Sequence, residues 1–239
     1  MSRHTRLVIG WTAALLAAAL FAWLGLWQGG RAVEKERMLA EVAGVLARRR
    51  PVPLAAAHER ARSQSYAWAA GRGRFTGEVL WLDNQQRDGR VGLRAYAPFR
   101  PRAGDPLLVD MGWAPGAPDR RRLPRLQLPT GEVELRGLLA PPPSHGLDLG
   151  APLARQADGW LMLRVDPAAI TTALASPRPF APRVLRLDPA LGYGLPRDLR
   201  LLANTLPPEK HRGYALQWFG LAATLLVIAL VLTFRKPRR

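Results

Sequence analysis

Residues 7–26, LVIGWTAALLAAALFAWLGL, and residues 214–234, YALQWFGLAATLLVIALVLTF, carry no charge and decide the fold of this chain. An α-helix rises 1.5 Å per residue, so each stretch spans about 30 Å, the thickness of the hydrocarbon core of a bilayer. Every aspartate and glutamate of the 239-residue chain lies between the two stretches. The sequence therefore predicts one transmembrane helix near each end and a polar domain between them.

Basic residues flank both apolar stretches on their outer sides. Arg3 and Arg6 precede the first stretch, and Arg235, Lys236, Arg238 and Arg239 follow the second. Because positive residues stay on the cytoplasmic side, both termini are expected in the cytoplasm and the central domain in the periplasm. A cleaved signal peptide is the alternative for the first stretch. Its apolar run is longer than the roughly 7–15 residues of a signal peptide, which favours a retained anchor.

The predicted organisation has three parts. Residues 1–27 form the first transmembrane helix, residues 28–213 the periplasmic domain, and residues 214–239 the second helix with a basic cytoplasmic tail. No arginine- and serine-rich presequence stands before residue 7, which favours the inner membrane of a bacterial cell.

Charge and cysteine content exclude several classes of function. The net charge of +17 would suggest nucleic acid in a soluble chain. Here the arginines are scattered or cluster beside the apolar stretches, where membrane topology accounts for them. The chain has no cysteine, which excludes disulfides, cysteine-ligated zinc and iron–sulfur clusters.

The central domain begins with a helix and continues with strands. Residues 28–50 have helical periodicity, Gly29 and Gly30 predict a kink or break, and Pro51 and Pro53 end the segment. Residues 167–175 form a short helix capped by Asp166. Residues 114–130 and 140–158 are rich in proline and glycine and are expected to be loops. The candidate strands are residues 66–75, 78–82, 93–99, 106–113, 131–139, 161–165 and 184–187.

Short and frequent strands predict a mainly antiparallel β domain, either a sandwich or a partly closed barrel. Together with the two terminal helices, this makes the expected fold an α+β membrane protein. The run at residues 71–75, GRGRF, is expected to be a turn or bulge and not a nucleotide-binding loop, because it lacks the third glycine.

Catalytic patterns are missing from the sequence. No G-x-S-x-G, H-E-x-x-H or Walker pattern occurs, and the four histidines are far apart. A membrane-anchored hydrolase would need a serine or carboxylate constellation, and none is visible. The chain is therefore expected not to be an enzyme.

One cluster at the start of the second apolar stretch is chemically informative. His211, Tyr214 and Trp218 are spaced i, i+3 and i+7, so a helix places them on one face. An aromatic belt at the membrane interface is the simpler interpretation. The alternative is a site for an amphipathic planar ligand, with imidazole on iron, aromatic walls and cations for carboxylates. Helix contact or a slot in the membrane would use the small residues Gly10, Ala13, Ala17, Gly25, Gly220 and Ala223.

Several motifs, in order, resemble those of the surfeit locus protein 1 family. They are Leu24-Gly25-x-Trp27-Gln28-x-x-Arg31-x-x-x-Lys35, the run Leu107-Leu108-Val109-Asp110-x-Gly112-Trp113-Ala114-Pro115 after residues 92–98, Arg164-Val165-Asp166-Pro167, and His211-x-x-Tyr214-Ala215-x-x-Trp218-Phe219-Gly220. The chain departs from the family pattern at Met111, at Glu209-Lys210 and at Glu34. The resemblance covers nearly the whole chain.

The resemblance implies an assembly factor for haem–copper cytochrome c oxidase that assists the delivery of haem a from haem a synthase into subunit I. His211 is then the axial ligand of the haem iron, Tyr214 and Trp218 form a wall, and Arg31 and Arg212 attract the propionates. The residues expected at protein interfaces are Trp27, Gln28, Gly112 and Trp113. The alternative function is a scaffold that stabilises a subunit I intermediate without binding haem.

Overall fold

The computed structural model describes residues 2–116, 122–143, 150–202 and 205–234. The chain forms two compact units. One consists of Met1–Ala40 and Thr205–Arg239, and the other of Glu41–Asn204. The predicted basic tail, and parts of the two predicted loops, lie outside the described residues.

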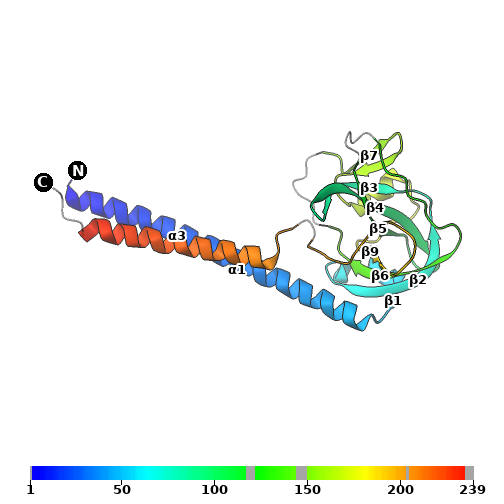
Figure 1. Ribbon diagram of the computed structural model, residues 1–239, viewed down its shortest axis with the longest axis horizontal. Helices are drawn as coiled ribbons and strands as arrows, with labels where there is room; N and C mark the ends of the chain where they lie inside the picture. The colour runs from blue at the N-terminus through cyan, green and yellow to red at the C-terminus, as the bar shows by residue number, and fades with distance from the viewer. Residues whose placement is uncertain (1, 117–121, 144–149, 203–204, 235–239) are drawn as a thin grey trace. The chain divides into compact units, whose positions relative to one another are not determined.

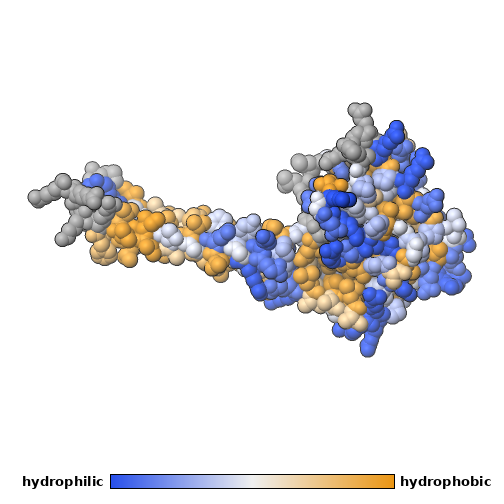
Figure 2. Space-filling view, viewed as in Figure 1, coloured by the Kyte–Doolittle hydropathy of each residue, from blue (hydrophilic) through white to orange (hydrophobic). Residues whose placement is uncertain are grey.

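Two long helices make up the first unit. Helix α1 spans Arg3–Arg48, although its last turns belong to the second unit, and helix α3 spans Pro208–Phe234. They lie side by side and antiparallel (Figure 1), since Trp11 donates a hydrogen bond to Thr233 and Phe21 contacts Trp218. Both helices are long and apolar enough to cross a membrane, and hydrophobic residues cover much of the pair's surface (Figure 2).

Helix α1 runs without interruption through Gly29 and Gly30, so the predicted break is wrong. Each glycine costs a helix only about 1 kcal/mol relative to alanine, which a helix of 46 residues tolerates. The helix ends where Arg49 adopts a left-handed conformation, φ 43°, two residues before Pro51. The predicted end of the helix before Pro51 is therefore confirmed. The physical reason is that a proline disfavours helical backbone at the residue before it.

Buried residues recur on α1 at alternating steps of three and four, as in a coiled coil. Small side chains occupy this stripe and its partner on α3: Ala14, Ala18, Gly25, Ala32, Ala215 and Ala222. Of the small residues predicted at the contact, only Gly25 is buried there. Gly10 and Gly220 have no atom within 4 Å of a Cβ position, and Ala13 and Ala223 are exposed. Ala17 is half-buried, so apart from Gly25 and Ala17 the predicted positions lie one or two residues from those that make the contact.

The second unit contains a mixed sheet of nine strands. Its order is β1-β2-β6-β9-β5-β4-β3-β8-β7, and an extra pairing of β2 with β4 closes five of the strands into a partial ring. Three of the pairings are parallel (β1–β2, β3–β8 and β5–β9) and the rest antiparallel. The strands are β1 Val52–Pro53, β2 Ala67–Phe75, β3 Leu80–Arg87, β4 Arg90–Pro101, β5 Leu107–Pro115, β6 Val133–Ala140, β7 Leu153–Gln156, β8 Gly159–Met162 and β9 Val184–Leu187.

The predicted fold class is confirmed, with the sheet mixed and the barrel only partly closed. Strand β7 falls inside a segment predicted to be a loop, and β1 was not predicted. The run at residues 71–75 lies inside β2, so the predicted turn or bulge is wrong. A Cβ at Gly73 would lie 2.2 Å from the carbonyl oxygen of Arg100, so this glycine permits β2 and β4 to meet at the seam.

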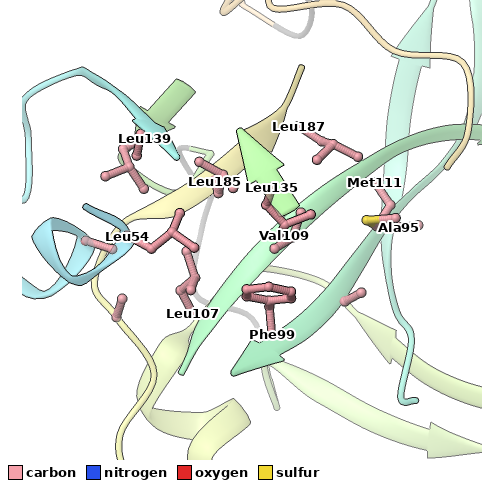
Figure 3. Close-up of a cluster of buried hydrophobic side chains, with 14 of the residues drawn as sticks. Leu54, Ala95, Phe99, Leu107, Val109, Met111, Leu135, Leu139, Leu185 and Leu187 are labelled. Atoms are coloured by element: carbon pink, nitrogen blue, oxygen red, sulfur yellow. The ribbon is translucent and has the colours of Figure 1, made fainter. Parts of the chain in front are cut away.

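Alternation along the strands gives the sheet an inner and an outer layer. Side chains from β4, β5, β6 and β9 point toward one another inside the ring (Figure 3). The side chains on the outer face of the sheet are covered by helix α2, Pro167–Ala173. Ile170 of this helix is fully buried against Leu80, Tyr96 and Leu108. Asp166 caps α2 as predicted, accepting hydrogen bonds from the backbone of Ala168 and Ala169.

Candidate functional site

His211 lies in the first turn of α3 and points toward α1. Pro208 begins this helix, a position where its missing N–H costs no helical hydrogen bond. The imidazole shares the inner face of α3 with Ala215, Trp218 and Ala222, and His211 is only 7% exposed. A polar ring is therefore buried between two helices near one end of the pair.

Among the described residues, only one of the two ring nitrogens of His211 has a hydrogen-bond partner. Nδ1 lies 2.6 Å from Oε1 of Gln28 on α1. Nε2 is buried and has no partner among the residues that the structure describes. Buried polar atoms are rarely left unpaired in native proteins, so this imidazole nitrogen is a candidate position for a further ligand.

Cations surround this imidazole. The charges of Lys35 and Arg31 act on His211. Arg31 pairs with Glu34 at 2.6 Å, and Arg212 pairs with Glu36 at 2.8 Å, both at the surface. The ammonium of Lys35 donates to the carbonyl oxygen of Leu206. Within the described part of the chain, Lys35 forms no ion pair with a carboxylate.

The aromatic residues predicted to line the site separate onto different faces. Trp218 packs on Phe21 of α1, with ring centroids 5.5 Å apart. Tyr214 is 41% exposed and lies on the flank of α3, because a three-residue step turns a helix about 60° away from His211. The structure thus brings His211 and Trp218 together on the inner face, with Tyr214 beside them on the outer surface.

The predicted interface residues occupy contrasting environments. Trp27 is 51% exposed on α1, and Gln28 is the partner of His211. Gly112 and Trp113 lie inside the β unit, where the Trp113 ring donates to the carbonyl of Gln85 at 2.8 Å and is 8% exposed. Trp113 therefore has a structural role, and contact of these four residues with another protein remains a prediction.

Sequence reasoning did not connect Gln28 or Lys35 with the histidine. Both were recognised in a motif, but neither was assigned to the ligand site. The signal was present, because Gln28 and Lys35 are seven residues apart and share one face of α1. Locating His211 opposite that face required the register of the antiparallel pair, which two uniformly apolar helices do not specify.

One imidazole limits the kind of metal that fits here. Protein sites for free ions need several ligands, and the described residues contain no group of three histidines or carboxylates that could hold one. A haem iron brings four equatorial nitrogens in its macrocycle and needs only an axial ligand from the protein. One imidazole can supply an axial ligand to a haem iron but cannot hold a free ion by itself.

Comparison with known proteins agrees with the resemblance seen in the sequence. No curated protein matches the chain. The model of the SURF1 family matches residues 15–223, which include most of α1, the first part of α3 and the whole β unit. The members of this family are assembly factors of cytochrome oxidase and are not enzymes. On this match, the chain belongs to the SURF1 family.

Proposed function

We propose that this cytochrome oxidase assembly factor binds haem a transiently and assists its delivery from haem a synthase into subunit I. The observation that carries the proposal is the buried Nε2 atom of His211, which has no partner among the described residues. A neutral imidazole nitrogen of this kind is a common axial ligand of haem iron.

The surrounding side chains suit the rest of the macrocycle. Trp218 offers an aromatic face two turns along α3 from His211, and Tyr214 offers a second face at the surface. Arg31 and Arg212 attract the haem propionates. Each arginine then replaces its present glutamate partner with a propionate carboxylate. Lys35 belongs to the same set of cations. Its ammonium has N–H donors besides the one that Leu206 accepts, and it forms no ion pair with a carboxylate in the described part of the chain.

The proposal includes a topology with both termini in the cytoplasm and residues 28–213 in the periplasm of a bacterial cell. Its support is the antiparallel pairing, which brings Trp11 near one terminus to Thr233 near the other. The natural chain has no cysteine. A single cysteine at Glu78 should therefore react with an impermeant thiol reagent added to whole cells, whereas one at Thr5 should not. Labelling of Thr5→Cys alone would reverse the topology and place His211 on the wrong side.

Haem binding is tested by expressing the full chain together with haem a synthase and purifying it in detergent. The wild-type protein should carry haem a, measured by its absorbance and by extraction. His211→Ala should lose most of it, whereas His4→Ala, which removes an exposed histidine from α1, should retain it. Equal haem content in all three proteins would exclude His211 as the ligand.

The scaffold alternative makes the opposite prediction in the same experiment. A colourless wild-type protein, with oxidase assembly unaffected by His211→Ala in cells, would leave a role that depends on contacts with subunit I alone. In that case the exposed residues of the chain, and not the buried imidazole, would carry the function.

A further inference from the structure

We infer that Gln28 is a positioning residue that fixes the tautomer of His211 and thereby presents Nε2, and not Nδ1, to the ligand. The inference deepens the proposed haem site and rests on it for the identity of the ligand. The fixed tautomer itself follows from the contact between the two side chains.

The short contact defines where the ring proton lies. Gln28 Oε1 is a carbonyl oxygen that can only accept, and it lies 2.6 Å from Nδ1 of His211. Nδ1 must therefore carry the proton, because two lone pairs at this distance would repel. A neutral imidazole has one N–H, so Nε2 is left with a free lone pair. That lone pair is the group that coordinates iron.

The alternative arrangements are less favourable. If the glutamine amide were turned so that its NH₂ donated to Nδ1, the ring proton would have to sit on Nε2. Nε2 is buried without an acceptor among the described residues. An unsatisfied buried donor is destabilising, because it has given up its hydrogen bond to water without gaining another. The observed amide orientation satisfies Nδ1–H and leaves only an acceptor atom unpaired, at the position where a metal would use it.

The choice of an amide over a carboxylate also has a chemical consequence. Histidine ligands usually donate their second N–H to a carboxylate or carbonyl, which orients the ring and raises its basicity. A neutral carbonyl orients the ring while making the imidazole a weaker donor than a carboxylate would. Weaker donation suits a protein that must release its haem to another, and it places no extra negative charge between two apolar helices.

The first experiment needs no haem. Nitrogen NMR of the full chain in detergent, labelled at histidine and assigned with His211→Ala, distinguishes the protonated from the bare ring nitrogen. Wild type should show Nδ1–H with bare Nε2. Gln28→Leu should show a mixture of tautomers, and Gln217→Leu, a matched change on the exposed face of α3, should resemble wild type. A wild-type ring protonated at Nε2 would overturn the inference.

The second experiment measures haem a retention and midpoint potential in the same variants. Gln28→Leu should weaken retention about 10-fold or more, the usual effect of losing such a partner. Gln28→Glu should restore retention with a lower potential, because the carboxylate strengthens donation to a ferric iron. Helix content from circular dichroism shows that each variant is folded.

The two experiments separate the two claims. If wild type shows the Nδ1–H tautomer but never retains haem, the proposed function fails and the role of Gln28 in fixing the ring stands. If wild type retains haem and Gln28→Leu retains it equally with an unchanged potential, the haem site stands and Gln28 has no positioning role.

Discussion

Phe219 lies directly over Gly25, so that a Cβ added to this glycine would come within 2.8 Å of the aromatic ring. The contact joins α1 and α3 about one turn from Gln28 on α1 and about two turns from His211 on α3. Without a hydrophobic driving force inside a bilayer, close packing of this kind is what holds two helices together. The position of His211 against α1 therefore depends on the close packing at Gly25, although Gly25 takes no part in the chemistry of the imidazole.

Replacing Gly25 by leucine is expected to weaken the helix pair by about 1–3 kcal/mol, the usual cost of overpacking. The measurement is unfolding of the full chain in mixed micelles, followed by tryptophan fluorescence. Gly220→Leu is the matched control, because no atom lies within 4 Å of its Cβ position. Equal losses of stability in the two variants would show that Phe219 does not pack on Gly25.

The elements that could be predicted are those marked by a local pattern of residues along the chain. Uncharged runs of membrane length gave α1 and α3, and period-two patterns between turn residues gave β9 with the correct bounds and most other strands within a few residues. The tight turn between β3 and β4 is at Asp88-Gly89, a pair typical of hairpin turns, and both residues have positive φ, 49° and 76°.

Features set by three-dimensional register were not predictable in this way. Strand β7 is four residues long and, among the described strands, pairs with β8 alone, so a short local pattern does not reveal it. The seam at Gly73 depends on a strand more than twenty residues away. The pairing of Gln28 with His211 depends on how two apolar helices align. For the seam and for the histidine, the deciding partner is distant in sequence and is not marked by composition.

The cap of α2 gives a second prediction. Asp166 accepts from Ala168 and Ala169 at 3.0 and 3.1 Å. Asp166→Ala should lower the stability of the β unit by about 1 kcal/mol, whereas Asp166→Asn, which keeps an acceptor, should cost less. Chemical denaturation of the full chain measures both. A larger loss for asparagine than for alanine would contradict the capping role.

Gly112 gives a third prediction, within the motif that contains Trp113. Its φ is +112°, and a Cβ would lie 2.6 Å from the carbonyl oxygen of Leu195. Gly112→Ala should lower the free energy of unfolding by more than about 2 kcal/mol. The strain of a positive φ and the clash with the carbonyl oxygen of Leu195 add together. Gly131→Ala is the control, because its φ of +77° is also positive but nothing lies within 4 Å. Similar losses at both sites would attribute the effect to φ alone.

The fourth prediction concerns Asp188, which directly follows β9 and is only 1% exposed. Burial alone would raise the pKa of this carboxyl group. The backbone N–H of Ala190 and the guanidinium of Arg136, at 3.0 and 2.8 Å, outweigh burial, and the pKa falls below its ordinary value of 3.8. The ionised form is therefore the one that folding stabilises.

A lowered pKa in the folded state means that this contribution to stability is present above about pH 4 and is lost as the pH falls further. Asp188→Asn should lower stability at pH 7 by about 1–3 kcal/mol, because Arg136 keeps only a neutral acceptor, and should flatten the loss below pH 4. Part of the acid slope remains, because the pKa of Asp198 is also lowered: burial would raise it, but hydrogen bonds from Arg200 outweigh burial. Asp105→Asn, in an exposed pair with Arg178, should change stability by less than about 1 kcal/mol. Denaturation of the full chain between pH 2 and 7 measures all three proteins, and an acid slope in Asp188→Asn as steep as in wild type would refute the assignment.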